Sequence, residues 1–515
     1  MRIIIPGPPG TGKTHHLINH YLVKEIEEYK THPSKIAYLT FSKAATEEAR
    51  KRIEPLFPKF DFKKDFINVS TMHGLGTREL NIDTSAQLLQ GRNWNQFKNF
   101  SQICDHMNFD STVGEEGFVQ HKNMYMKIIE YARSTRVNLK IEDLEEVAIE
   151  LDLINDPSLD ISTLEQIYTD LEFFKKSYYM FEFSDMIKQF IEKDKCPSLD
   201  AVFLDEAQDL NPLQWDMFKY IESRCKRSYI AGDDDQTIYA FQGANPDSFI
   251  NLQGTYDPQI ISRRVPRKIH QLATSIFPHM SYRLEKKWEP RDAEGEITRD
   301  KYLEEIDLSK GNWMILVRTN KMLSPIVEHL ESLNYRFDCK LNYLLPIKLV
   351  EAIKIWERLN KGASVSKEEA KLLYGFLRYN KGDLKYGFSE GKTLEKIDSV
   401  DIDDLREHHG LLVKGDWQVL SMSDEQKQFI KNLLDQGEDL FKPARIKVST
   451  IHGVKGEESD NVILFTDLTQ FIYESVEKNP DPEHRLFFVG ITRTKNHLYL
   501  VPPTSEYIYN IGESI

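Results

Sequence analysis

Short apolar runs alternate with helically spaced stretches over the first part of the chain. A β-branched run at residues 2–5 precedes a glycine-rich turn, and apolar residues then recur at helical spacing over 17–26. Further apolar runs lie at residues 35–41, 66–69, 201–204 and 228–231. This alternation of strand and helix is typical of a parallel sheet with crossover helices.

A second set of apolar runs lies further along, at residues 313–317, 446–449, 462–465 and 497–501, with a helical stretch at 483–495 before the last of them. The sequence therefore predicts an α/β protein with two cores. Two polar stretches of helical pattern interrupt the alternation and are expected to be helical insertions. The expected cores are residues 1–84 with 181–262 and residues 263–344 with 443–515, and the expected insertions are 85–180 and 345–442.

Composition excludes several classes of protein. Hydrophobic residues make up 40% of the 515 residues, the mean hydropathy is -0.49, and no apolar run approaches the roughly 18 residues of a membrane span. The first residues lack a secretory signal, and four dispersed cysteines indicate neither a disulfide framework nor a zinc module. A cytoplasmic protein is expected. The net charge of -14 is not that of a simple nucleic-acid binder, although a cleft can be locally basic.

A phosphate-binding loop is indicated at residues 7–14, where GPPGTGKT matches G-x-x-x-x-G-K-[ST] between an apolar strand and an amphipathic helix. In such a loop, backbone N–H groups face the phosphates, Lys13 reaches the β and γ oxygens, and the Thr14 hydroxyl ligates magnesium. The expected ATP-binding residues of this loop are Gly7, Pro8, Pro9, Gly10, Thr11, Gly12, Lys13 and Thr14.

An acidic pair follows the apolar run 201–204. Asp205 is placed to hold magnesium with Thr14, and Glu206 is placed to act as the general base that deprotonates the attacking water. A DExxD string alone is most often a solvated helix start, so this assignment depends on the upstream loop.

The order of further motifs resembles the UvrD/Rep/PcrA-type helicases of superfamily 1. LTFSKAATEEARKRI resembles motif Ia, VSTMHGL motif Ib, LDEAQD motif II and AGDDDQTIYAFQGA motif III. SRRVPRKI resembles motif IV, STIHGVKGEESD motif V and EHRLFFVGITRTK motif VI. The resemblance extends over nearly the whole chain and implies two RecA-like cores with ATP bound between them.

The resemblance also implies roles for matching residues at the nucleotide. Gln236 is similar to the glutamine that senses the γ-phosphate, and Glu458 to the motif V glutamate that binds ribose. Arg264 and Arg493 resemble the two arginines that reach the γ-phosphate, and an arginine of this kind is worth about 10³- to 10⁵-fold in rate.

On the DNA side, Phe41 and Phe241 match aromatic positions that stack on bases, and stacking is worth about 1 to 3 kcal/mol per base. Other matching positions lie near the DNA backbone in the family. These positions are Thr71, His73, Thr450, His452 and Lys455.

Some positions depart from the family pattern. Arg263 stands where a tyrosine stacks on adenine in the family, and His15 stands where an arginine follows the Walker threonine. In motif III, Phe241 and Gln242 replace the usual Trp and Arg. The printed sequence starts at the first strand, without the upstream glutamine segment that reads adenine, which leaves the choice between ATP and GTP open.

The expected function is an ATP-dependent helicase or translocase that moves 3' to 5' on single-stranded DNA, with ATP and Mg²⁺ as cofactors. The expected DNA partners are single strands and single-strand/duplex junctions, with replication or repair proteins as candidate partners and no membrane. Three alternatives stay open: a translocase that strips proteins without unwinding, an ATP-gated binding module, and an RNA track. A viral protein that acts in the host cytoplasm is also compatible with the sequence, which indicates neither pathway nor oligomeric state.

Overall fold

The chain divides into two compact units. The computed structural model describes all residues except 92, 102–106, 110, 114–118, 122, 137–138, 152, 155, 343, 379–381, 389–393, 395–397 and 512–515. The first unit comprises Met1–Glu296, Gln470–Asn496 and Asn510–Ile515, and the second comprises Ile297–Thr469 and His497–Tyr509. No helix of the described residues has the length and apolar character that crossing a bilayer requires.

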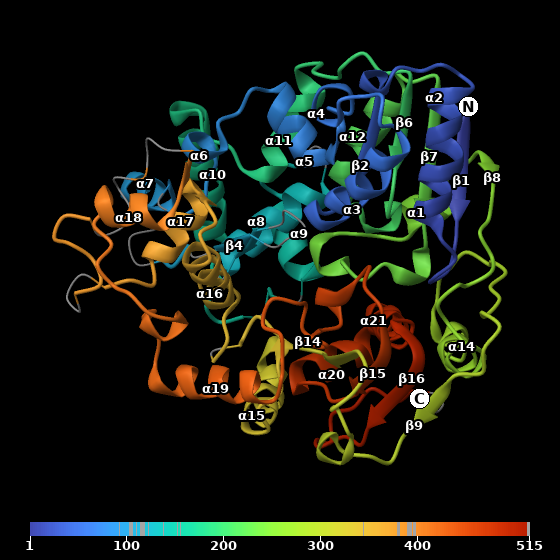
Figure 1. Cartoon of the computed structure of the whole chain (residues 1–515). Coiled ribbons are helices and arrows are strands. Elements are labelled where there is room, and N and C mark those ends of the chain that lie inside the picture. The colour runs from blue at the N-terminus through green and yellow to red at the C-terminus, as the bar shows by residue number, and fades with distance from the viewer. Residues whose placement is uncertain are drawn as a thin grey trace. The chain divides into compact units, whose positions relative to one another are not determined.

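The first unit is built on a six-stranded sheet with the order β3-β2-β6-β7-β1-β8. Every neighbouring pair in it is parallel, and Figure 1 shows β2, β6, β7, β1 and β8 side by side in this order. The strands are β1 (Arg2–Pro6), β2 (Ile36–Thr40), β3 (Val69–Thr71), β6 (Ala201–Leu204), β7 (Arg227–Gly232) and β8 (Thr255–Tyr256). Strands β2 and β6 are buried along their whole length, as expected for a parallel sheet covered on both faces.

Helices connect these strands and begin with recognisable caps. Ser42 caps α3 (Lys43–Ile53) through Ala45 N–H (3.1 Å), and Asn211 with Gln214 forms a capping box at α12 (Pro212–Glu222). The helix after β1 is composite: α1 (Lys13–His16) continues as the π-helical segment η1 (Leu17–Leu22) and then as α2 (Val23–Glu27). The other helices of this unit outside its helical insertion are α4 (Phe62–Asp65), α5 (Met72–Glu79), α6 (Thr84–Gln87), α11 (Phe183–Glu192), α13 (Asp247–Ile250), α14 (Arg267–Thr274), α20 (Gln470–Lys478) and α21 (Asp481–Ile491).

A mainly helical insertion between β3 and β6 has its own apolar core. Trp94, Phe97, Ile129, Leu164 and Phe174 lie in that core. Its elements are α7 (Asn93–Phe100), the antiparallel pair β4 (Ser111–Val113) and β5 (Val119–His121), α8 (Met124–Thr135), α9 (Asp143–Glu150) and α10 (Ile161–Tyr178).

The second sheet has the order β11-β14-β10-β15-β16-β9. Strand β10 pairs in parallel with β14 and β15, and β14 with β11. The strands are β9 (Glu296–Thr298), β10 (Trp313–Val317), β11 (Phe337–Asp338), β14 (Ile446–Thr450), β15 (Ser459–Phe465) and β16 (Thr494–Val501). With the first sheet, it confirms the predicted α/β fold with two parallel-sheet cores.

A second mainly helical stretch lies between β11 and β14. Trp356 is fully buried in its core and donates its indole N–H to the carbonyl of Gly415 (3.0 Å). Its elements are α16 (Ile347–Asn360), β12 (Val365–Ser366), α17 (Lys367–Tyr374), β13 (Ser399–Val400), α18 (Ile402–Glu407) and α19 (Asp424–Asp435), and α15 (Leu323–Ser332) precedes them. The expected division into two cores and two insertions at the stated boundaries stays a prediction.

Two predicted elements differ from the structure. The strand expected at 66–69 starts only at Val69, because Asp61 accepts from the N–H of Lys63 (3.0 Å) and starts α4. The helix expected at 483–495 ends at Ile491, and β16 begins at Thr494. At residues 66–69 apolar residues cross the boundary between two elements, so the apolar pattern alone does not mark it. After Ile491 the residues up to Asn496 are polar and carry no apolar pattern that would mark the change from helix to strand.

Candidate nucleotide and nucleic-acid site

The phosphate-binding loop connects β1 to α1, as the sequence predicts. Gly10 (φ 76°) and Gly12 (φ 86°) are in the left-handed region, which favours glycine. The loop curls around its own lysine, because the Lys13 ammonium donates to the carbonyl of Gly7 at 2.6 Å. The Thr11 hydroxyl donates to the carbonyl of Pro8 at 2.8 Å and tightens the turn. The ammonium of Lys13 therefore lies inside the loop, at the start of a helix whose N–H groups favour an anion.

Asp205 and Glu206 lie directly after β6, beside this loop. The Thr14 hydroxyl donates to Asp205 Oδ2 at 2.7 Å, and the Tyr38 hydroxyl donates to the same oxygen at 3.1 Å. Burial and the charge of Glu206 raise the pKa of Asp205 to about 6. Glu206 has φ 54° and ψ 44°, a left-handed conformation that costs a non-glycine residue about 1 kcal/mol or more. Such local strain is typical of a position where function fixes the side chain.

The segment that follows β8 is bonded to the phosphate-binding loop. The Ser262 hydroxyl donates to the carbonyl of Pro9 (2.9 Å), and Arg263 N–H donates to the carbonyl of Gly10 (2.8 Å). An added Cβ at Gly10 would come within 2.6 Å of Arg264 Cβ and of Ser262 Oγ. Arg264 is thus anchored by its backbone next to the loop, within the first unit.

A chain of hydrogen bonds runs from Glu206 to Arg493 inside the first unit. Gln208 donates to Glu206 Oε2 (2.6 Å), and its carbonyl oxygen accepts from Asp233 N–H (2.9 Å). Asp233 Oδ2 accepts from the Gln236 amide (2.7 Å), and Gln236 Oε1 accepts from Arg493 Nη2 (3.0 Å). The structure therefore brings together three residues expected at the nucleotide, Glu206, Gln236 and Arg493.

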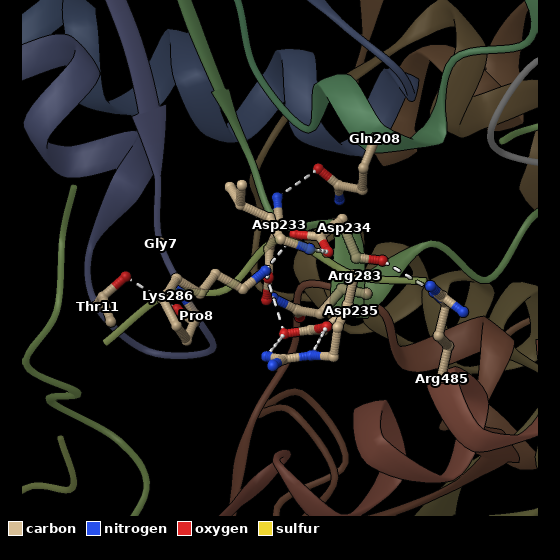
Figure 2. Close-up of polar contacts among 12 residues, drawn as sticks. Gly7, Pro8, Thr11, Gln208, Asp233, Asp234, Asp235, Arg283, Lys286 and Arg485 are labelled. Carbon is tan, nitrogen blue, oxygen red and sulfur yellow. Dashed lines mark hydrogen bonds and ion pairs between the residues drawn. The ribbon is translucent and has the colours of Figure 1, made fainter. Parts of the chain in front are cut away.

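Three consecutive aspartates, Asp233, Asp234 and Asp235, are fully buried and surround the ammonium of Lys286 (Figure 2). Lys286 pairs with all three, with a distance of 3.1 Å to Asp235 Oδ2. Arg283 binds Asp235 through two hydrogen bonds of 2.9 and 2.8 Å. We call Asp233, Asp234, Asp235, Arg283 and Lys286 the aspartate cluster.

The aspartate cluster also reaches α21. Arg485 Nε donates to the main-chain carbonyl of Asp234 at 3.1 Å (Figure 2). Leu284 N–H donates to Asp234 Oδ2 at 2.7 Å. The turn that carries Gln236 is therefore held from two sides, by the segment after α14 and by α21.

Sequence reasoning assigned no role to Lys286, Arg283, Gln208 or Arg485. A signal for Lys286 and Arg283 exists in the sequence, because three consecutive aspartates next to an apolar strand need cations when they are buried. The sequence does not show which of the 67 lysines and arginines supply those charges.

The residues of the first unit that are expected at DNA differ in their exposure to solvent. Phe241 is 52% exposed, whereas Phe41 is 6% exposed and packs its ring against Tyr239 (centroids 4.9 Å apart). Thr71 and His73 line a cavity of about 550 Å³, together with Lys43, Thr77, Arg78 and Phe183. Burial of its ring lowers the pKa of His73 to about 4, so this imidazole is neutral at physiological pH.

The motif V residues belong to the second unit. Thr450 ends β14, and its hydroxyl accepts from Gly453 N–H at 3.3 Å. His452 and Lys455 follow in the same turn, and Glu458 is exposed just before β15. The roles expected for these four residues stay predictions.

Two family models match this chain. Residues 2–257 match the UvrD/REP helicase N-terminal domain, and residues 392–502 match the UvrD-like helicase C-terminal domain. The ATP-dependent DNA helicase PcrA of Leuconostoc citreum is 24% identical over 69% of this chain and 49% of its own length. A probable DNA helicase II homolog of Mycoplasma pneumoniae is 23% identical over 97% of this chain and 81% of its own length.

The crystal structure of an arterivirus helicase, nonstructural protein 10, aligns with 98% of this chain and 61% of its own at 10% identity. Its TM-score is 0.33, which is too low to argue a shared fold. The chain spans about half the length of the PcrA relative. The two domain matches nevertheless cover most of the chain in the order found in helicases, and the chain belongs to the UvrD-like family of superfamily 1 helicases.

Proposed function

We propose that this chain is an ATP-hydrolysing motor that moves on single-stranded DNA in the 3' to 5' direction. The observation that supports the proposal best is the hydrogen-bonded path from Glu206 through Gln208 and Asp233 to Gln236 and Arg493. A motor needs its hydrolysis site linked to its track site, and this path joins the proposed base to Gln236, from which the chain continues to the exposed ring of Phe241. The direction of movement is taken from the family resemblance.

The residues at the phosphate-binding loop fit ATP with Mg²⁺. Mg²⁺ prefers oxygen ligands, and the Thr14 hydroxyl and Asp205 carboxylate place two such oxygens 2.7 Å apart beside the loop. These two residues would hold the ion, and the ion supplies positive charge to the phosphate oxygens. Lys13 adds a second positive charge from inside the loop.

Glu206 is proposed to take the proton of the attacking water. Its carboxylate is oriented by the amide of Gln208, and its backbone N–H donates to Asp205 Oδ1 at 3.0 Å. Arg493 and Arg264 would stabilise the charge that develops on the γ-phosphate. The Arg264 guanidinium reaches the carbonyl of Thr492 (3.5 Å), so both arginines are connected to the end of α21.

The link to DNA begins at Gln236. Tyr239 and Phe241 follow it within one short segment, and the Tyr239 ring contacts Phe41. A shift of Gln236 would therefore move an aromatic surface on which bases stack. The cavity lined by Thr71 and His73 is proposed to receive the DNA backbone or a base next to that surface.

The test measures ATP hydrolysis with and without single-stranded DNA. Wild type is expected to be strongly stimulated, Glu206→Gln to lose hydrolysis about 100-fold or more while it still binds nucleotide, and Glu425→Gln, on an exposed face of α19, to behave as wild type. Hydrolysis that does not respond to DNA would refute the motor and favour an ATP-gated binding module.

A second set of measurements separates the remaining alternatives. Strand separation of a duplex with a 3' single-stranded tail, compared with a 5' tail, tests both unwinding and direction. Displacement of a protein from single-stranded DNA without strand separation would identify a translocase that only strips proteins. Stronger stimulation by RNA than by DNA of the same sequence would identify RNA as the track.

A further inference from the structure

A buried ion cluster lies where the helical insertion meets α11, away from the nucleotide site. It contains two cations and four carboxylates from α8, α10 and the start of α11: Arg133, Lys175, Glu130, Glu172, Glu182 and Asp185. Lys175 pairs with Glu172 (2.9 Å), Glu182 (3.0 Å) and Asp185 (2.8 Å), and Arg133 pairs with Glu172 and Glu182. Four carboxylates facing two cations leave this cluster with two surplus negative charges when all of its members are ionised.

The two oxygens of Glu182 have different surroundings. Both cations, Arg133 and Lys175, bind Oε2 of this carboxylate. Oε1 is buried and has no hydrogen-bond partner among the residues that the structure describes. A buried carboxylate oxygen without a partner costs about 1 to 3 kcal/mol. Oε1 of Glu182 is therefore a strong acceptor that is available to a bound group.

His121, at the end of β5, faces the same place. The residue is 6% exposed, and its Nδ1 is buried without a hydrogen-bond partner in the described part of the chain. One ring nitrogen of His121 and one carboxylate oxygen each of Glu130 and Glu182 lie within 4.8 Å of one another. Two side chains that each hold an unpartnered buried atom, His121 and Glu182, therefore lie close together with the carboxylate of Glu130.

We propose that His121, Glu130 and Glu182 form a binding site for one divalent transition-metal ion, with Zn²⁺ as the best fit and Mn²⁺ as the next. One imidazole nitrogen with two carboxylate oxygens is a donor set that Zn²⁺ accepts in tetrahedral geometry with a fourth ligand. Mg²⁺ and Ca²⁺ prefer oxygen donors alone. Donors around tetrahedral zinc lie roughly 3.4 Å apart, so small side-chain rotations would close the site.

The charge balance supports the assignment. A divalent cation at this point neutralises the two surplus charges of the ion cluster and gives Nδ1 of His121 and Oε1 of Glu182 their missing partner. The ligands come from β5, α8 and the residue that precedes α11, and α11 packs against α5 and α12. The ion would therefore fasten the hairpin of the insertion to helices of the first sheet.

A proton is the competing explanation. Burial and the neighbouring charge of Glu182 raise the pKa of Glu130 to about 8, so a protonated Glu130 can donate to Glu182 without any metal. In that case the three side chains form a hydrogen-bonded group that takes up no ion. The experiment must therefore measure metal content directly.

The experiment uses the full chain, stripped with a chelator and dialysed against ZnCl₂ with excess Mg²⁺ to occupy sites built from oxygen alone. Elemental analysis is expected to find one tightly held Zn²⁺ per chain. Loss of a residue that only hydrogen-bonds a metal ligand weakens metal binding about 10- to 100-fold. His121→Ala and Glu130→Gln each remove a ligand itself, so they are expected to weaken Zn²⁺ binding by more than this. His408→Ala, whose side chain is 68% exposed in the second unit, is the matched control and is expected to keep the ion.

Cobalt gives a second measurement that does not depend on the variants folding. Co²⁺ in the wild-type chain is expected to show visible ligand-field bands of a site with nitrogen and oxygen donors, and Zn²⁺ is expected to displace them. Absence of bound Zn²⁺ and of these bands in wild type would overturn the proposal and favour the shared proton. Zn²⁺ retained equally by His121→Ala, Glu130→Gln and His408→Ala would also overturn it. ATP hydrolysis is not a readout here, so failure of the motor proposal would leave this test intact.

Discussion

The substitution Lys286→Met tests whether the aspartate cluster holds the motif III turn in place. Methionine has nearly the length of lysine but lacks the ammonium that pairs with Asp233, Asp234 and Asp235. In wild type, three carboxylates face Lys286 and Arg283, and in the variant Arg283 alone remains. Removing one partner of a buried ion pair costs about 3 to 5 kcal/mol, because it leaves charge buried without compensation.

The sign of the pH effect follows from the same contacts. The aspartates raise the pKa of Lys286 well above its ordinary value, so its contribution to stability is fully present below pH 10 and is lost only in strong alkali. At neutral pH the variant is expected to melt roughly 5 °C or more below wild type. The deficit is expected to shrink in acid, because burial raises the pKa of Asp234 and its protonation removes one of the uncompensated negative charges.

The assay is thermal unfolding of the full chain with nucleotide absent, followed by DNA-stimulated ATP hydrolysis at a temperature where the variant is folded. Lys287→Met is the matched control, since Lys287 is 70% exposed and pairs only at the surface with Glu289 (2.6 Å), which is worth about 1 kcal/mol or less. We expect Lys286→Met to lower turnover as well, because Asp233 also positions Gln236. Equal melting temperatures and turnover for the two variants would refute the reasoning.

Three further predictions concern the nucleotide site. Asp205→Asn is expected to abolish hydrolysis and to raise the melting temperature above pH 6. A pKa raised from 3.8 to about 6 means that ionising this carboxylate in the folded state costs about 3 kcal/mol, and asparagine does not carry that cost. A gain in melting temperature that persists at pH 4 would contradict this. Gln208→Leu is expected to reduce DNA stimulation of hydrolysis at least tenfold and to destabilise by about 1 to 3 kcal/mol, since it leaves Asp233 N–H without its partner; unchanged stimulation would break the proposed link. Gly10→Ala is expected to weaken nucleotide binding, measured with a fluorescent analogue, far more than the control Gly362→Ala. Gly362 has a similar φ of 82°, and a Cβ added there would have nothing within 4 Å. Equal effects of the two substitutions would argue against a crowded loop at Gly10.

The phosphate-binding loop, the acidic pair and both sheets could be predicted because each depends on local pattern. GPPGTGKT fixes its own turn through glycine, the runs that become β6 and β10 are apolar throughout, and β1 is apolar after Arg2. The predicted family then supplied Gln236 and Arg493, and the structure joins these two by a hydrogen bond.

The partners of buried charges could not be predicted, because they are chosen by tertiary structure. Lys286 lies 53 residues from Asp233 in sequence, and its neighbour Lys287 is solvent-exposed. His121 and Glu182 lie further apart still and meet only because the insertion folds back onto α11. Apolar periodicity carries no information about such pairs. The three consecutive aspartates indicate that cations must lie near them, but the sequence does not indicate which lysine or arginine side chains these are.

The π-helical segment Leu17–Leu22 has a consequence for how this helix tolerates length changes. A π-helical turn holds about one residue more than an α-helical turn, so the segment behaves like a one-residue insertion accommodated within an existing helix. The residues before it present Lys13 and Thr14 to the loop, while the extra residue sets the rotation at which Leu17, Ile18, Tyr21 and Leu22 meet the apolar core. Deleting one residue here would restore a regular helix and turn one end by about 100° relative to the other. The apolar core and the phosphate-binding loop could then no longer both keep their contacts. The number of residues in this helix is therefore set by the contacts at its two ends together.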